Sequence, residues 1–177
     1  ERGIVIRGNY FHQLGLEAFS HGQNGVYPDN GSMGWLVEGN VFARIGGVRD
    51  PATFSAGVNI NSGAHILTRS NGFLDCSMTL KLSRHAGSTT SIYEANQAQW
   101  KKVLGEGAAS RIPAHFARYP ELSQFWKEPR QFPDTCTFEG NLVANPRVPL
   151  QPANGHYAAL REGAYDECET LQVSGNR

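Results

Sequence analysis

Seven polar residues between positions 27 and 85 have side chains suited to binding or cleaving a polysaccharide. The catalytic candidates are Asp29, Lys81 and Arg84, and the substrate-binding candidates are Tyr27, Asn59, Asn61 and His85. A polysaccharide lyase needs a cation that neutralises the substrate carboxylate and a base that removes the neighbouring proton. Lys81, Arg84 and His85 are residue types that fill those two roles. The sequence therefore predicts a lyase-like site if these residues come together.

The same residues also have simpler interpretations. A glycoside hydrolase needs two facing carboxyl groups, and this stretch supplies only Asp29, with Asp75 as a distant second candidate. Asp29 also lies in the sequence Pro-Asp-Asn-Gly, which is typical of a turn. Lys81 and Arg84 are equally typical of solvated surface cations. No spacing of His, Cys and Asp resembles a metal site, so we predict neither a metal nor a cofactor.

The elements that would position these residues form an internal repeat. Five segments share the pattern apolar, any, apolar, charged, small, Asn, and their asparagines are Asn9, Asn40, Asn71, Asn141 and Asn176. The asparagines are separated by 31, 31, 70 and 35 residues, so the long interval indicates a repeat that holds an insertion. A repeat of this period predicts a solenoid.

Aligning the five segments on their asparagines predicts which residues stack. Three rows are apolar and should face inward: Ile4, Trp35, Ile66, Cys136 and Leu171; Ile6, Val37, Thr68, Phe138 and Val173; and Phe11, Phe42, Phe73 and Val143. A charged row alternates in sign and should lie outside: Arg7, Glu38, Arg69 and Glu139. The small residue before each Asn should adopt a left-handed bend, and the stacked amides should hydrogen-bond from repeat to repeat.

A second strand in each repeat gathers the candidate site. The segment 25–34 aligns with 57–65, and 79–84 is a plausible third copy. This alignment turns Val26, Val58 and Leu80 inward. It predicts an outward row of Tyr27, Asn59 and Lys81, with Asp29, Asn61 and Ser83 just beyond it.

The interval 84–134 is predicted to be a helical and loop insertion within one domain that spans 1–177. Two stretches in it have helical spacing, 91–104 and 112–126, and the second is broken at Pro120. Cys76 and Cys136 match core positions. Three cysteines permit several arrangements, among them a disulfide between Cys136 and Cys168, and the sequence does not choose between them.

Composition narrows the function classes. Sixteen basic residues balance 16 acidic ones, so no charge excess predicts binding to nucleic acid. No run of 18 apolar residues predicts a membrane span. The strand pattern reaches both ends of the sequence without a capping element, so we expect a portion of a longer protein, with other protein subunits as candidate partners at the open ends.

The segments GVYPDNGSMGWLVEGNVF and GVNINSGAHILTRSNGFLDC, together with ARYPEL, resemble right-handed parallel β-helix proteins related to pectate lyases. More closely, they are similar to a group with coils of the form G-[IV]-Y-x-D-[DN]-G-[SA]-x-G-W. The resemblance covers most of 25–143 and implies an all-β, right-handed parallel β-helix that is extracellular and binds or cleaves polysaccharide. The chain departs from the group at Asn30 and at 61–64, where two departures remove charge.

Two functions therefore remain open. The first is a secreted, carbohydrate-active β-helix, either a polysaccharide lyase or hydrolase or a catalytically weakened binder. The alternative is a structural or adhesive solenoid in a larger extracellular assembly. The sequon Asn30-Gly-Ser predicts a candidate glycosylation site, and a glycan there would favour the structural alternative because it would block the proposed groove.

Overall fold

The structure is a computed structural model. It describes residues 3–15, 23–29, 32–46, 55–61, 64–83, 114, 117–118, 136–145, 152–153, 156–157 and 172–177. The chain divides into two compact units, one made of Glu1–Arg84 with Phe132–Arg177 and the other of His85–Gln131. In the second unit the described residues are Ala114, Ala117 and Arg118, which have helical backbone and are exposed. All of the strands below belong to the first unit.

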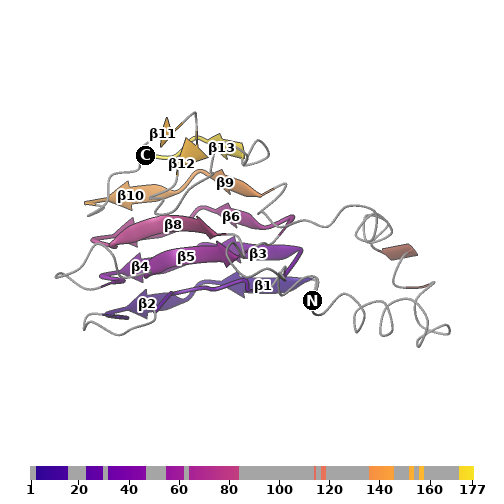
Figure 1. The fold of residues 1–177 in the computed structure, drawn as a ribbon, viewed down its shortest axis with the longest axis horizontal. Coiled ribbons are helices and arrows are strands. Elements are labelled where there is room, and N and C mark those ends of the chain that lie inside the picture. Colours follow the sequence, from indigo (N-terminus) through magenta and orange to yellow (C-terminus); the bar gives the residue numbers. More distant parts are fainter. Residues whose placement is uncertain are drawn as a thin grey trace, which may run out of the picture. The chain divides into compact units, whose positions relative to one another are not determined.

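Parallel strands dominate the described residues (Figure 1). A five-stranded parallel sheet has the order β1 (Ile4–Arg7), β3 (Trp35–Glu38), β6 (Leu67–Arg69), β9 (Thr137–Glu139), β13 (Gln172–Ser174). A four-stranded parallel sheet has the order β10 (Leu142–Ala144), β7 (Gly72–Leu74), β4 (Val41–Ala43), β2 (Tyr10–His12). A third parallel sheet pairs β5 (Ala56–Asn61) with β8 (Met78–Ser83), and a short antiparallel pair joins β11 (Pro152–Ala153) to β12 (His156–Tyr157). The predicted all-β character is thus confirmed for the first unit.

The register of these sheets is the one that the asparagine alignment predicts. Ile4 pairs with Trp35 and Phe11 pairs with Phe42. The register also survives the long interval, because Thr68 pairs with Phe138 although 70 residues separate them. The strands of successive repeats lie one above another in Figure 1.

Three left-handed bends recur in each repeat. The predicted bend immediately before each Asn is confirmed, with φ of 67° at Gly8, 61° at Gly39 and 54° at Ser70. A second bend lies four residues after the Asn, where the positive-φ residues are Gln13, Arg44, Asp75 and Asn145. A third precedes the first strand, at Gly3, Gly34 and His65. The last two bends fall largely on residues other than glycine, and the sequence analysis did not predict them.

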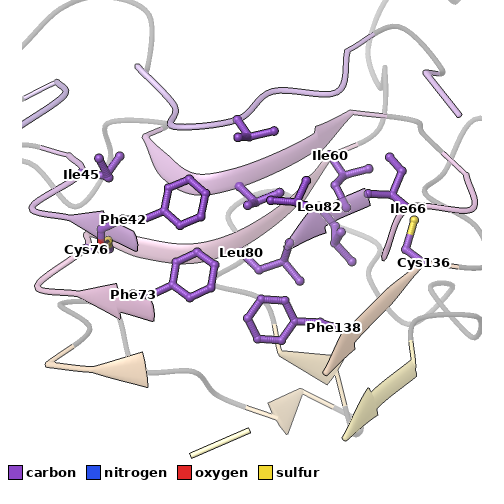
Figure 2. Packing of buried hydrophobic residues seen from close by; sticks show 13 residues of the cluster. Phe42, Ile45, Ile60, Ile66, Phe73, Cys76, Leu80, Leu82, Cys136 and Phe138 are labelled. Atoms are coloured by element: carbon purple, nitrogen blue, oxygen red, sulfur yellow. Dashed lines mark hydrogen bonds between the residues drawn. The ribbon is translucent and has the colours of Figure 1, made fainter. Parts of the chain in front are cut away.

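The core is a stack of aromatic rings (Figure 2). Phe11 and Phe42 stack at 5.0 Å between ring centroids, and Phe42 and Phe73 at 4.9 Å. Phe138 continues the stack with a tilt of 39° against Phe73, although it belongs to a different predicted row. The fourth repeat has the smaller Val143 in the phenylalanine row. Phe138 therefore fills space that a fourth phenylalanine of that row would take.

The predicted inward rows are otherwise confirmed. Val37, Phe42, Phe73 and Ile66 are at most 1% exposed, and Thr68 is also buried. Cys76 and Cys136 are both buried in the same core cluster. Cys168 and the predicted helix 91–104 lie outside the described residues, and most of 112–126 does as well.

Candidate functional site

The alignment that gathers the candidate site is confirmed by the strand pairing. Val26 bridges to Val58, and Val58 pairs with Leu80, so these three residues form an inward row. Asn59 pairs with Lys81 one residue further along. Since successive side chains on a strand point to opposite faces, Asn59 and Lys81 lie on the face away from the core.

Tyr27, Asp29 and Asn61 form a polar cluster on that face. The amide Nδ2 of Asn61 donates to Oδ1 of Asp29 at 2.7 Å and lies 3.3 Å from the hydroxyl of Tyr27. Asn61 is 6% exposed, Asp29 is half-buried and Tyr27 is 43% exposed. The cluster therefore presents an aromatic ring to solvent, backed by an amide and a carboxylate.

Electrostatics link two members of the cluster. The pKa of the Tyr27 hydroxyl is raised above its ordinary value of 10.0, first by burial and then by the charge of Asp29 and a hydrogen bond to it. The hydrogen bond to Asn61 acts in the opposite direction. Tyr27 therefore stays a neutral hydroxyl donor at physiological pH, beside a carboxylate acceptor.

The rest of the predicted row is not open to solvent. Asn59 is 3% exposed and Lys81 is 9% exposed. An ammonium group this deeply buried requires partners, because burial of an unpaired charge is costly. The expectation of an open groove along Tyr27, Asn59 and Lys81 is therefore wrong at the last two positions, where the outer face is covered as fully as the inner face.

Three further candidates lie outside the described residues: Arg84, His85 and the sequon residue Asn30. Asp75, the second carboxylate candidate, follows β7 at a left-handed bend and is exposed. It belongs to the end of a different sheet from Asp29. The structure therefore gives no evidence for a facing pair of carboxyl groups at these two positions.

The charged row forms ion pairs over its first three members. Glu38 accepts from Nε of Arg7 and from Nε of Arg69, each at 2.7 Å. These hydrogen bonds, with Arg69 the larger influence, lower the pKa of the Glu38 carboxyl. Among the ion pairs of the described residues, Arg69 does not reach Glu139, because its guanidinium turns toward Glu38. A shallow depression of about 440 Å³ lies over Glu38, Arg69 and Glu139.

The sequence analysis missed an exposed apolar row on the four-stranded sheet. Tyr10 pairs with Val41, and Gly72 lies between Val41 and Leu142. Tyr10, Val41 and Leu142 are 60%, 37% and 55% exposed. The signal was present, since each of these residues directly follows a repeat asparagine and so has outward parity.

Comparisons with protein-family models, curated proteins and solved structures find no match for this chain. Within the described part of the chain, no group of three or more His, Cys, Asp or Glu side chains could hold a metal ion. The described residues also include no helix that is long and apolar enough to cross a membrane.

Proposed function

We propose that the chain is a right-handed parallel β-helix that binds a neutral polysaccharide through Tyr27, Asp29 and Asn61. Three parallel sheets with one shared register and three recurring bends support the β-helix. A right-handed path is expected, because crossovers between parallel strands of one sheet are almost always right-handed. The resemblance of 25–143 to pectate-lyase-related proteins agrees with this architecture.

The cluster of Tyr27, Asp29 and Asn61 is the observation that supports sugar binding. Each hydroxyl of a sugar both donates and accepts a hydrogen bond, and a carboxylate with a neighbouring amide offers acceptors and donors in one plane. The exposed Tyr27 ring supplies an apolar face for the C–H groups of the sugar, with a polar hydroxyl at its tip. Asp29 would repel a uronate, so a neutral sugar with vicinal hydroxyls fits better than an acidic one.

Binding fits this geometry better than cleavage. A lyase base must reach the substrate, and Lys81 is only 9% exposed. A hydrolase needs a carboxyl partner for Asp29, and Asp75 belongs to the end of another sheet. We therefore propose a non-catalytic binder that acts outside the cell, where polysaccharides are abundant.

Binding is tested by titrating the protein with a panel of neutral and uronic-acid oligosaccharides, followed by calorimetry. A neutral oligosaccharide should bind, and Tyr27→Ala and Asp29→Ala should each weaken binding by about tenfold or more. The matched control is Tyr10→Ala, because Tyr10 is also an exposed tyrosine but lies on the four-stranded sheet. Tyr10→Ala should bind like the unchanged protein. Equal losses in the two tyrosine variants, or release of unsaturated products, would contradict the proposal.

A structural or adhesive role is the second candidate. It is favoured by the ladder of asparagine side chains, which links all five repeats. Such a ladder stabilises a scaffold whatever the scaffold binds.

A further inference from the structure

The asparagine ladder has a direction. In every step, both the backbone N–H and the side-chain Nδ2 of one asparagine donate to Oδ1 of the next, at 2.8 to 3.0 Å. The order of the steps is Asn9, Asn40, Asn71, Asn141, Asn176. One edge of the ladder must therefore present an acceptor and the other edge donors.

A second contact accompanies each step. The other hydrogen of Nδ2 reaches back to a carbonyl of the preceding repeat. Asn40 donates to the Ile6 carbonyl at 2.9 Å and Asn71 to the Val37 carbonyl at 3.0 Å. Asn141 and Asn176 follow the same rule, with the carbonyls of Thr68 and Phe138. In each case the acceptor lies three residues before the asparagine of the preceding repeat.

Asn9 departs from this rule. Its Nδ2 donates to the carbonyl of Arg7, in its own strand, at 3.1 Å. Asn9 is exposed, and no donor among the described residues reaches its Oδ1. Its amide therefore adopts a local substitute for the contact that a preceding repeat would supply.

The opposite edge is complementary. Among the described residues, the backbone N–H of Asn176 has no acceptor, and its Nδ2 makes one contact to Phe138 beyond the ladder step from Asn141. The edge strands are β13 at this side and β1 at the other. The edge residues Ser174 and Arg7 carry no like charges, so stacking them creates no repulsion.

We propose that two copies of this chain join head to tail, with β13 of one copy pairing in parallel with β1 of the next. The N–H and Nδ2 of Asn176 then donate to Oδ1 of Asn9 in the second copy. The Nδ2 of that Asn9 switches from the Arg7 carbonyl to the Val173 carbonyl of the first copy. This reproduces, between copies, the geometry of all four internal steps. A head-to-tail contact that does not close into a ring generates an open, elongated assembly.

Register-specific cross-linking tests the pairing directly. Continuing the ladder makes Arg7 of one copy the register partner of Ser174 of the other. Parallel neighbours lie about 4.8 Å apart, within the Cα separation that a disulfide accepts. An equimolar mixture of Arg7→Cys and Ser174→Cys proteins should form a mixed disulfide dimer under mild oxidation. The control mixture, Val5→Cys with Ser174→Cys, keeps the same face of the strand but is two residues out of register. Equal cross-linking in both mixtures would overturn the proposal.

Sedimentation velocity tests the ladder contact itself. The weight-average sedimentation coefficient should rise between about 1 and about 100 µM protein. Asn176→Asp keeps the acceptor for Asn141 but turns a carboxylate oxygen toward Oδ1 of the incoming Asn9, so it should weaken association about tenfold or more. Asn145→Asp is the matched control, because it makes the same exchange at an exposed, left-handed residue outside the ladder. Circular dichroism of each variant checks the monomer fold. A monomer at every concentration, or equal association in the two variants, would show that the ladder edges do not join.

Discussion

The close approach of Gly57 to the aromatic stack gives the sharpest test of the core. A Cβ atom added at Gly57 would lie 2.6 Å from Cε1 and 2.7 Å from Cδ1 of Phe73. Ordinary carbon contacts are about 3.5 to 4.0 Å, so the overlap approaches 1 Å. Phe73 is fully buried and stacked on Phe42, which leaves its ring little room to retreat.

Gly57→Ala should therefore lower the free energy of unfolding by about 1 to 3 kcal/mol, the usual cost of overpacking. The substitution also restricts the unfolded chain, which favours folding by about 0.4 to 1 kcal/mol. This gain is smaller than the cost, so the net change is destabilising. Urea denaturation followed by circular dichroism measures it.

Two further variants decide whether the ring is the cause. Gly72→Ala is the matched control, because its added Cβ would meet only a methyl group of Val41 at 3.9 Å. It should change stability little. Combining Gly57→Ala with Phe73→Leu should cost less than the sum of the two single changes, since the shorter side chain relieves the overlap. Additive costs, or a Gly57→Ala protein as stable as the Gly72→Ala protein, would refute this account of the core.

Three other predictions concern the stack and the two described carboxylates. Phe42→Ala should cost about 3 to 5 kcal/mol in urea denaturation, because it opens a cavity between two stacked rings. The pKa of Glu38 is lowered in the folded protein, so its stabilising effect is present above its ordinary pKa of 4.5 and is lost as the pH falls through the folded value. The stability difference between the unchanged protein and Glu38→Gln should accordingly shrink in acid, and a constant difference would count against the ion pairs. The pKa of Tyr27 is raised, so its contribution is present below 10.0 and is lost as the pH rises through the folded value. Asp29→Asn should lower that pKa, as measured by tyrosinate absorbance against Tyr27→Phe; an unchanged titration would exclude Asp29 as a cause.

The register and the core could be predicted because the sequence states them five times. Each asparagine fixes the offset of the apolar positions around it, and the pairing of Thr68 with Phe138 follows this offset across the long interval. The bend before each Asn was also predictable, because glycine occupies it in four of the five repeats. Local residue type and repetition agree at these positions.

Two features could not be read from spacing. The bends at Gln13 and Arg44 fall on residues with no preference for left-handed backbone, so the repeat imposes them through the register of the sheets. The burial of Asn59 and Lys81 depends on what packs against the outer face of their strands, and strand parity says only which face a side chain takes. Spacing therefore located the candidate site but not its exposure.

The central claim is that a neutral sugar binds at Tyr27, Asp29 and Asn61. Nuclear magnetic resonance of the ¹⁵N-labelled protein, titrated with the best neutral oligosaccharide from the panel, tests it most directly. The account predicts that the side-chain amide signal of Asn61 shifts with the sugar concentration, and that Asp29→Ala abolishes this shift while Tyr10→Ala preserves it. An Asn61 amide that stays unchanged while signals of Tyr10 or Val41 shift would contradict the claim and move binding to the four-stranded sheet.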